Sequence, residues 1–271
     1  MHSWHALTIA EQTLMRRALA GHALAGVVQD YGDALRWAGR ADAPPLRSFT
    51  EREQRALVPH LAGVAVDLAE RGLPTVEVRQ SHGAGASALV AGPELREVLT
   101  DPAHWLWTPR PSRNVGLTAP QPVRERWFGA GYPTADTSAL PTWEELSIGR
   151  REVLVCAAEA SGMLTGAFGI WADPPDDLGA IARRAWVDRQ LAPLSSFVRE
   201  GWIEVRHHPD EARDAFTVIP FEGLRAALTD PAVRYQGEDW GVGVGCVFTH
   251  AGLAVWRGGW GDAWGRRLTL S

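Results

Sequence analysis

Lysine is absent from this 271-residue sequence: all 27 basic side chains are arginine, and asparagine occurs once, at Asn114. Because lysine and asparagine codons are AT-rich, we attribute this composition to a GC-rich coding sequence. The absence has chemical consequences whatever its origin. A Walker-A phosphate loop, a pyridoxal Schiff base and a kinase-type phosphate clamp each require a lysine, so these mechanisms are excluded.

Cysteine is scarce as well, since the 271 residues include only Cys156 and Cys246. Two cysteines do not build the disulfide framework of a small secreted domain, and their number fits a reducing compartment. Residues 1–17 lack the basic-then-apolar order of a signal peptide. We therefore expect a cytoplasmic protein.

Long apolar runs and a strong excess of one charge are also missing. The most apolar stretch, residues 153–172, carries Glu159, and a charge at a bilayer centre costs about 3 kcal/mol. The formal net charge of −5 provides no general attraction to nucleic acid or to anionic lipid. We expect a globular chain of one or two domains without membrane association.

An internal repeat runs through the sequence. LREVLTDPA, beginning at Leu95, recurs as LRAALTDPA, beginning at Leu224, and the two positions differ by 129. Trp127 and Trp256 differ by the same 129. Chance could produce one such match, but several matches at one interval and in one order indicate a duplication.

Two further matches extend the repeat upstream. LAERG followed by VEVR, within 68–79, matches FVREG followed by IEVR, within 197–206. LTI at 7–9 resembles LSI at 146–148, and this interval of 139 indicates about ten additional residues in the first copy, which we place at 40–49. The chain then divides into copy 1 at 1–128, a linker rich in Gly, Pro and Thr at 129–142, and copy 2 at 143–271.

Capping-box spacing predicts two helix starts in copy 1, at Thr8 with Glu11 and at Thr50 with Glu53. We expect the first helix to continue through residues 14–28. The second is amphipathic and ends at Gly72. An alternating strand, a hairpin return and a short helix stopped by proline follow.

Copy 2 repeats this order of elements. A long amphipathic helix ends at Gly201, the segments WIEVR and FTVI form a hairpin, and a helix runs between Pro220 and Pro231. The segments 241–249 and 252–256 also have the residue alternation of strands, which predicts one more hairpin.

Each copy thus has helices first, then a helix that leads directly into a hairpin, and then a further helix. This order of elements is similar to that of the winged helix-turn-helix superfamily. LAPLSSFVREGWIEVR, residues 191–206, resembles the recognition helix and first wing strand of that superfamily. The resemblance implies an α+β fold of two tandem winged-helix-like pseudo-repeats, a pseudo-dimer within one chain, and a DNA-binding role in transcription regulation. Copy 1 departs from the pattern, because its hairpin tip HGAGA at 82–86 is not basic.

Basic side chains gather at the predicted recognition helix and wing of copy 2. Arginine forks suit phosphates and guanine edges, so double-stranded DNA is the expected partner. Acidic residues lie among the basic ones and reduce the net charge. We expect groove contacts from Arg189, Ser196 and Arg199, and phosphate contacts from Arg206, His207 and Arg213.

Two other interpretations remain open. In the first interpretation, the protein is an adaptor or an assembly component. In the second interpretation, it is an enzyme that uses no catalytic lysine. An adaptor would dock a protein partner through an aromatic surface. That surface would consist of Trp240, Trp256, Trp260 and Trp264.

Cofactor and metal motifs are weak, and we expect neither a cofactor nor a metal. Residues 83–88 match G-x-G-x-x-A after a strand, but copy 2 has no glycine at the equivalent tip, which favours a hairpin turn over a dinucleotide site. HExxH and CxxC are absent, and the adjacent His207 and His208 point to opposite faces of a strand. Cys156 lies in an apolar helix, where a thiol usually serves as packing. We therefore expect a non-catalytic protein that binds DNA through copy 2.

Overall fold

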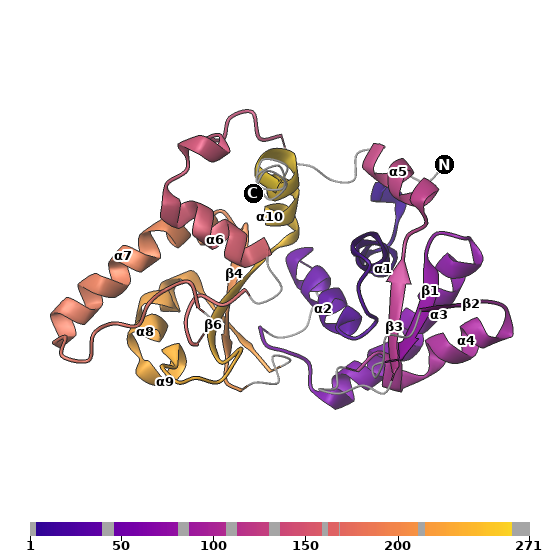
Figure 1. The fold of residues 1–271 in the computed structure, drawn as a ribbon, viewed down its shortest axis with the longest axis horizontal. Helices are drawn as coiled ribbons and strands as arrows, with labels where there is room; N and C mark the ends of the chain where they lie inside the picture. Colours follow the sequence, from indigo (N-terminus) through magenta and orange to yellow (C-terminus); the bar gives the residue numbers. More distant parts are fainter. Residues whose placement is uncertain are drawn as a thin grey trace. The chain divides into compact units, whose positions relative to one another are not determined.

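The computed structural model describes residues 4–39, 46–80, 87–106, 113–129, 136–158, 162–167, 169–210 and 215–261. The chain forms two compact units, 1–132 and 133–271, and the boundary falls inside the predicted linker. Each unit combines helices with a small antiparallel sheet, which confirms the predicted α+β class (Figure 1). Two predicted site residues, Arg213 and Trp264, and the tip at 82–86 lie outside the described residues.

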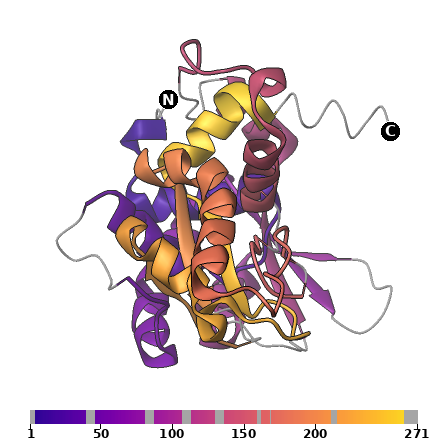
Figure 2. The ribbon, with the colours of Figure 1, turned by 90° about the vertical axis from the view of Figure 1, so that its left-hand side faces the viewer.

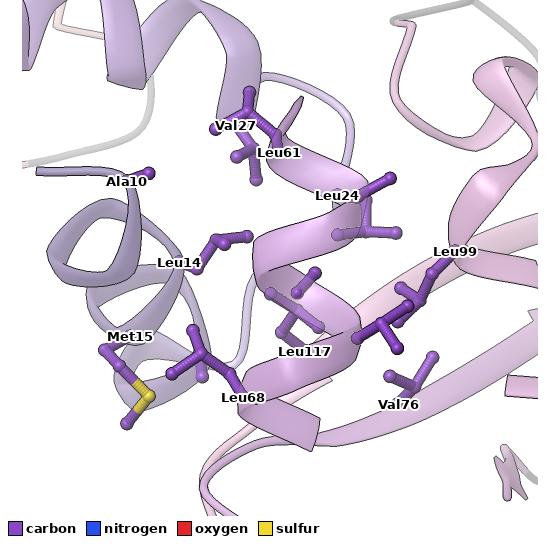
Figure 3. Packing of buried hydrophobic residues seen from close by; sticks show 14 of the residues in the cluster. Ala10, Leu14, Met15, Leu24, Val27, Leu61, Leu68, Val76, Leu99 and Leu117 are labelled. Atoms are coloured by element: carbon purple, nitrogen blue, oxygen red, sulfur yellow. The ribbon is translucent and has the colours of Figure 1, made fainter. Parts of the chain in front are cut away.

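The first unit packs helices against a three-stranded sheet of order β2-β1-β3. Leu14 of α1, Leu61 and Leu68 of α3 and Leu117 of β3 are fully buried and point into one interior (Figure 3). The elements are η1 (Trp4–Ala6), α1 (Ile9–Ala20), α2 (Val27–Trp37), α3 (Glu51–Glu70), β1 (Thr75–Gln80), β2 (Ala88–Val90), α4 (Pro93–Thr100), η2 (Pro102–His104), β3 (Arg113–Thr118) and α5 (Gln121–Gly129).

The second unit has the corresponding sheet, of order β5-β4-β6. One face of this sheet is covered by α7, with α8 beside that helix (Figure 1). The elements are η3 (Trp143–Glu145), α6 (Ile148–Ala158), α7 (Ala180–Arg199), β4 (Ile203–His208), β5 (Thr217–Ile219), η4 (Phe221–Gly223), α8 (Leu224–Thr229), α9 (Pro231–Arg234), β6 (Gly243–Phe248), α10 (His250–Val255) and the π-helical turn η5 (Trp256–Trp260).

The two sheets have one register when residue numbers are shifted by 129. Val76 of β1 lies opposite Leu117 of β3, and Val205 of β4 lies opposite Cys246 of β6. All three pairs between β1 and β2 recur between β4 and β5 with the same shift. The helices α3 and α7 are each 20 residues long and also begin 129 residues apart. The two units therefore share one topology at the level of individual backbone pairs.

This register corrects one predicted alignment. Val76 corresponds to Val205, so VEVR at 76–79 lies two residues out of step with IEVR at 203–206. A shift of two residues keeps every strand side chain on its original face. A short alternating motif therefore cannot distinguish the two alignments, whereas the backbone pairing does.

The segment after the first helix docks in the same way in both units. Leu24 donates its backbone N–H to Val115 of β3, and Leu164 donates its own to Val244 of β6, both at 2.8 Å. The helix α2 has no equivalent in the second unit, where the described residues of 166–179 contain no helix. The additional residues of copy 1 therefore include α2 and do not lie only at 40–49.

The predicted helix starts at Thr8 and Thr50 are confirmed, since each hydroxyl accepts the backbone N–H three residues ahead and the glutamate there completes the box. The predicted continuous helix through 14–28 is wrong, because Gly21 adopts a left-handed φ of 70° that ends α1. The predicted strand at 252–256 is also wrong. The Thr249 hydroxyl caps the N–H of Gly252, so this segment is helical instead.

Candidate nucleic-acid interface

The predicted groove-facing residues lie on α7, the long helix of the second unit. Its inner side carries Val187, Leu191, Leu194 and Phe197, which share one core with Ile203 of β4. In Figure 2 this helix stands in front of the sheet that it covers. The core therefore fixes which side of α7 turns outward.

The outward side of α7 combines exposed arginines with small side chains. Arg189 and Arg199 are exposed, and so are Ala182, Ala185 and Ala192. Ten residues separate the two arginines, which is about 15 Å along a helix axis. Because alanine side chains are short, a partner surface can approach this side of the helix closely.

The arginines of α7 are poorly compensated by acidic side chains. The helix has four arginines and one acid, and that acid, Asp188, pairs with Arg225 of α8 at 2.6 Å. The Arg199 guanidinium lies 4.9 Å from the ring centre of Phe221. Within the described part of the chain, no ion pair involves the other three, Arg183, Arg184 and Arg189.

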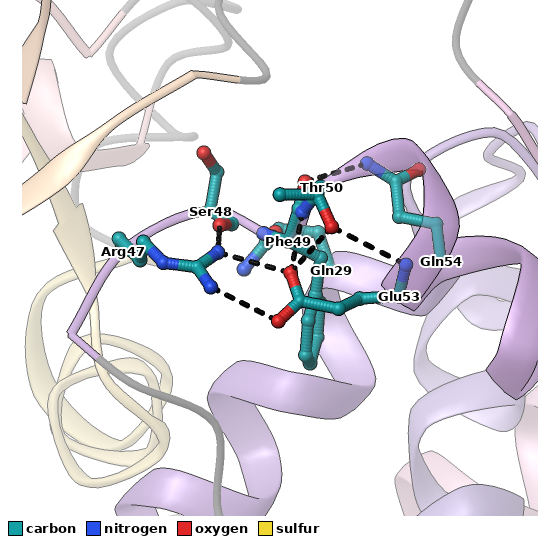
Figure 4. Close-up of polar contacts among 7 residues, drawn as sticks. All are labelled: Gln29, Arg47, Ser48, Phe49, Thr50, Glu53 and Gln54. Carbon is teal, nitrogen blue, oxygen red and sulfur yellow. Dashed lines mark hydrogen bonds and ion pairs between the residues drawn. The ribbon is translucent and has the colours of Figure 1, made fainter.

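The equivalent helix of the first unit, α3, has the opposite charge, with two arginines and four acids. One of the acids, Glu53, accepts hydrogen bonds from both terminal nitrogens of Arg47, at 2.9 and 3.0 Å. It also accepts a hydrogen bond from the backbone N–H of Thr50 at 2.7 Å (Figure 4). The hydrogen bonds from Arg47, and then those from Thr50, lower the pKa of Glu53 to about 2. The start of α3 is thus neutralised by a capping network, whereas α7 has Gly179 as its cap and no acid in its first turn.

Ser196, the third residue predicted on α7 to face DNA, contacts α6 instead. Its hydroxyl oxygen accepts a hydrogen bond from Arg150 at 3.2 Å. The Arg150 guanidinium also lies 5.7 Å from the ring centre of Phe197. Ser196 is half-buried and its hydroxyl is engaged, so we assign it to the packing between the two helices.

The two described wing residues, Arg206 and His207, are neighbours on β4 and therefore point to opposite faces of the sheet. Arg206 pairs with Glu204 at 2.8 Å, and its guanidinium lies 4.1 Å from the ring centre of Phe216. Its charge is therefore compensated within the strand. This pairing makes Arg206 a poor candidate for a phosphate contact.

His207 is half-buried on the other face. Burial lowers the pKa of His207, and the attraction of Asp230 offsets this effect only in part. The imidazole is consequently neutral at pH 7. Arg206 and His207 therefore add no uncompensated positive charge to the predicted wing.

A buried arginine that sequence analysis did not single out contacts α7. Arg234 of α9 is 1% exposed, and it donates to the carbonyl of Ala172 at 2.6 Å, to Gln190 at 3.1 Å and to Asp173 at 3.4 Å. Its guanidinium lies 4.8 Å from the ring centre of Trp186, and its Nη1 has no hydrogen-bond partner among the described residues. Burial lowers the pKa of Arg234, and Asp173 opposes that shift.

The first unit has an apolar cluster at this position. Trp105 takes the place of Arg234, and Leu57 and Leu61 take the places of Trp186 and Gln190. The signal was present in the repeat, because LTDPAHW aligned with LTDPAVR puts an arginine opposite a tryptophan. The polar cluster is therefore a feature of the second unit and not a requirement of the fold.

The predicted aromatic docking surface is not formed as expected. Trp260 is 2% exposed and donates its indole N–H to the carbonyl of Pro141 at 2.9 Å. Trp256 packs edge-on against Trp143 with ring centres 5.9 Å apart, as Trp127 does against Trp4 in the first unit. Of the predicted tryptophans in the described residues, only Trp240 is exposed, at 49%, and Trp264 lies outside them. Two of the four, Trp256 and Trp260, therefore belong to the core of the second unit, where edge-to-face aromatic pairs stabilise the packing.

A groove of about 480 Å³ lies beside α7 and α8. Its charged lining is balanced between two arginines and two acids, so the groove itself is not a basic surface. The lining residues are Arg184, Glu222, Arg225, Ala226, Thr229 and Asp230.

Comparison with protein-family models, with curated protein sequences and with solved structures finds no match. Among the described residues, no helix combines the length and the apolar character needed to cross a bilayer. The same part of the chain contains no group of three or more His, Cys, Asp or Glu side chains placed to hold a metal ion.

Proposed function

We propose that this protein is a non-catalytic DNA-binding protein whose second, winged-helix-like unit contacts duplex DNA through α7. The observation that carries the proposal is the charge of this helix. Four of its side chains are arginines that form no ion pair with any described residue, whereas the equivalent helix α3 carries a net negative charge.

The positions of the arginines strengthen the proposal. The N-terminal end of a helix already carries a partial positive charge, so a cation there gains nothing from the helix dipole. Arg183 and Arg184 nevertheless lie within the first two turns of α7. Side chains placed against the preference of the helix are explained by an anionic partner, and phosphate is the anion that arginine forks bind well.

The shape of α7 is also suitable. A single helix fits the major groove of B-form DNA, and short side chains on its outward face allow the arginines to reach past them. The proposed interface consists of Arg184, Arg189 and Arg199. Arg206 is left out because Glu204 compensates it, and the first unit is assigned no DNA contact.

The test is a titration of a fluorescein-labelled, mixed-sequence DNA duplex, read by fluorescence anisotropy. A chain with Arg184→Ala, Arg189→Ala and Arg199→Ala should lose at least tenfold in affinity, because each phosphate contact contributes to binding. The matched control replaces Arg52 and Arg55 of α3 by alanine and should bind as the wild type does. A triple variant that retains wild-type affinity would refute the proposal.

A protein partner is the second candidate, and one observation favours it. Ile181, on the outward side of α7, is 88% exposed, more than any other large apolar side chain of the described residues. An acidic protein surface with an apolar centre would fit this side as well. Ile181→Gln should weaken such a complex and leave binding of the labelled duplex unchanged, so the two candidates separate on this variant.

A further inference from the structure

The only two cysteines of the chain lie in contact with each other. Cys156 is on α6 and Cys246 is on β6, 90 residues further along the chain, and their sulfur atoms are 3.8 Å apart. Both side chains are buried and both thiols are free. In a sequence with so few cysteines, two that meet inside one core form a defined pair.

The pair is held by hydrogen bonds on both sides. The Cys246 thiol donates to the sulfur of Cys156, and the Cys156 thiol donates to the carbonyl of Met163 at 3.2 Å. The backbone N–H of Cys246 donates to the carbonyl of Gly162 at 2.6 Å. The hydrogen bond to Cys156, and then burial, raise the pKa of Cys246 well above its ordinary value. These hydrogen bonds hold the two sulfurs beside each other.

The first unit shows that the fold does not require this pair. At the equivalent positions it has Arg17, which pairs with Asp30, and Leu117, which is fully buried. The first unit therefore has a salt-bridged arginine and a leucine at the two positions where the second unit has thiols. The fold therefore does not require thiols at these positions, and their contact in the second unit brings together two groups that can react with each other.

We propose that Cys156 and Cys246 are an oxidation site that closes to an intramolecular cystine, with hydrogen peroxide as the oxidant. One thiol is oxidised to a sulfenic acid and releases water. The second thiol then attacks that sulfur, the S–S bond forms, and the hydroxyl leaves with the thiol proton as a second water. Two thiols and one peroxide give one cystine and two waters. Peroxide is suitable because it is small enough to enter a core through brief local opening.

The disulfide would link α6 covalently to β6 within the second unit. The sulfurs need to approach from 3.8 Å to about 2.0 Å, which requires a small movement of α6 and β6 toward each other. The bond would close a loop of 90 residues, and a loop of this length strongly restricts the unfolded chain. The second unit should therefore melt at a higher temperature after oxidation, whereas the first unit should not change.

The experiment treats the full-length chain with hydrogen peroxide, unfolds it in denaturant and alkylates it with iodoacetamide. The oxidised protein should take up no alkyl group, should weigh two hydrogens less than the reduced protein, and should melt at least about 5 °C higher by differential scanning calorimetry. Cys156→Ala and Cys246→Ala should each show no rise in melting temperature after the same treatment.

Peptide mapping of the oxidised wild type gives a readout that does not depend on either variant folding. It should yield one cross-linked peptide pair containing Cys156 and Cys246. Two alkylated cysteines after oxidation, a bond between two chains, or oxidation that stops at a sulfinic acid on one sulfur would each overturn the proposal. None of these outcomes bears on DNA binding, so this inference and the proposed function fail independently.

Discussion

Arg234 occupies in the second unit the position that Trp105 occupies in the first, 129 residues earlier in the chain. Both side chains are almost completely buried, at 1% and 0% exposure. The indole N–H of Trp105 donates to one backbone carbonyl, that of Leu99, at 2.7 Å. Arg234 instead connects α9 to α7 and to the segment before it through several donors. The duplication thus provides an internal control that separates what the fold needs from what one unit has added.

Arg234→Ala should lower the free energy of unfolding of the second unit by about 3 kcal/mol, because it removes several hydrogen bonds of a buried side chain and opens a cavity. Arg234→Met should recover part of that loss, since it restores volume without a charge. Trp105→Ala should cost the first unit about 3–5 kcal/mol. Urea unfolding measures all three variants. An Arg234→Ala loss under about 0.5 kcal/mol would show that the cluster contributes nothing to stability.

Two glycines at equivalent positions should respond differently to alanine. Gly26 and Gly166 both have a left-handed φ, of 91° and 85°. A Cβ on Gly166 would lie 2.4 Å from the backbone oxygen of Val242, whereas one on Gly26 would lie 2.6 Å from the flexible end of Arg17. Gly166→Ala should therefore cost about 2 kcal/mol or more in urea unfolding, and Gly26→Ala about 1 kcal/mol. Equal losses would contradict this account of the crowding.

The tryptophans near the C-terminus can be sorted by their effect on stability. Trp260→Ala should cost about 3–5 kcal/mol, because it empties a buried site and leaves the carbonyl of Pro141 without its donor. Trp240→Ala should change the free energy of unfolding by less than about 0.5 kcal/mol, since this side chain is half exposed. Similar, small losses for both would restore the interpretation of an aromatic docking surface.

Glu53 should titrate near pH 2 instead of at its ordinary value of 4.5. Because the folded state lowers this pKa, the stabilisation from the Arg47 and Thr50 contacts is complete above about pH 4.5 and disappears as pH falls through about 2. The carboxyl chemical shift, followed by NMR between these values, measures the midpoint. Arg47→Ala should raise the midpoint toward 4.5, and a wild-type midpoint already at 4.5 would contradict the network in Figure 4.

The parts of the fold that the sequence predicted are those with local signals. Capping boxes located the starts of α1 and α3, and Gly72 and Gly201, at φ of 70° and 71°, mark the turn from each long helix into its strand. The interval of 129 located the duplication. Each of these features depends on one residue or a short string, which is why sequence alone revealed them.

What the sequence did not predict depends on contacts that no motif encodes. Glu204 neutralises Arg206 from two residues away, and strand alternation alone would have placed both side chains on one face, but only the structure shows them at pairing distance. The burial of Trp260 depends on a carbonyl 119 residues away. The five residues 252–256 fit both a helical and a strand pattern of apolar residues, and the cap from Thr249 favours the helix. The winged-helix resemblance and the paired arrangement it implies stay predictions.

The central claim is that the arginines of α7 bind phosphate, and the salt dependence of DNA binding tests it most directly. The affinity for a labelled duplex should be measured over a series of KCl concentrations for the wild type and for Arg189→Ala. The logarithm of the association constant should fall with the logarithm of salt with a slope of about −3 for three phosphate contacts, and the variant should be less steep by about one. A wild-type slope near zero, or a slope that Arg189→Ala leaves unchanged, would contradict the claim.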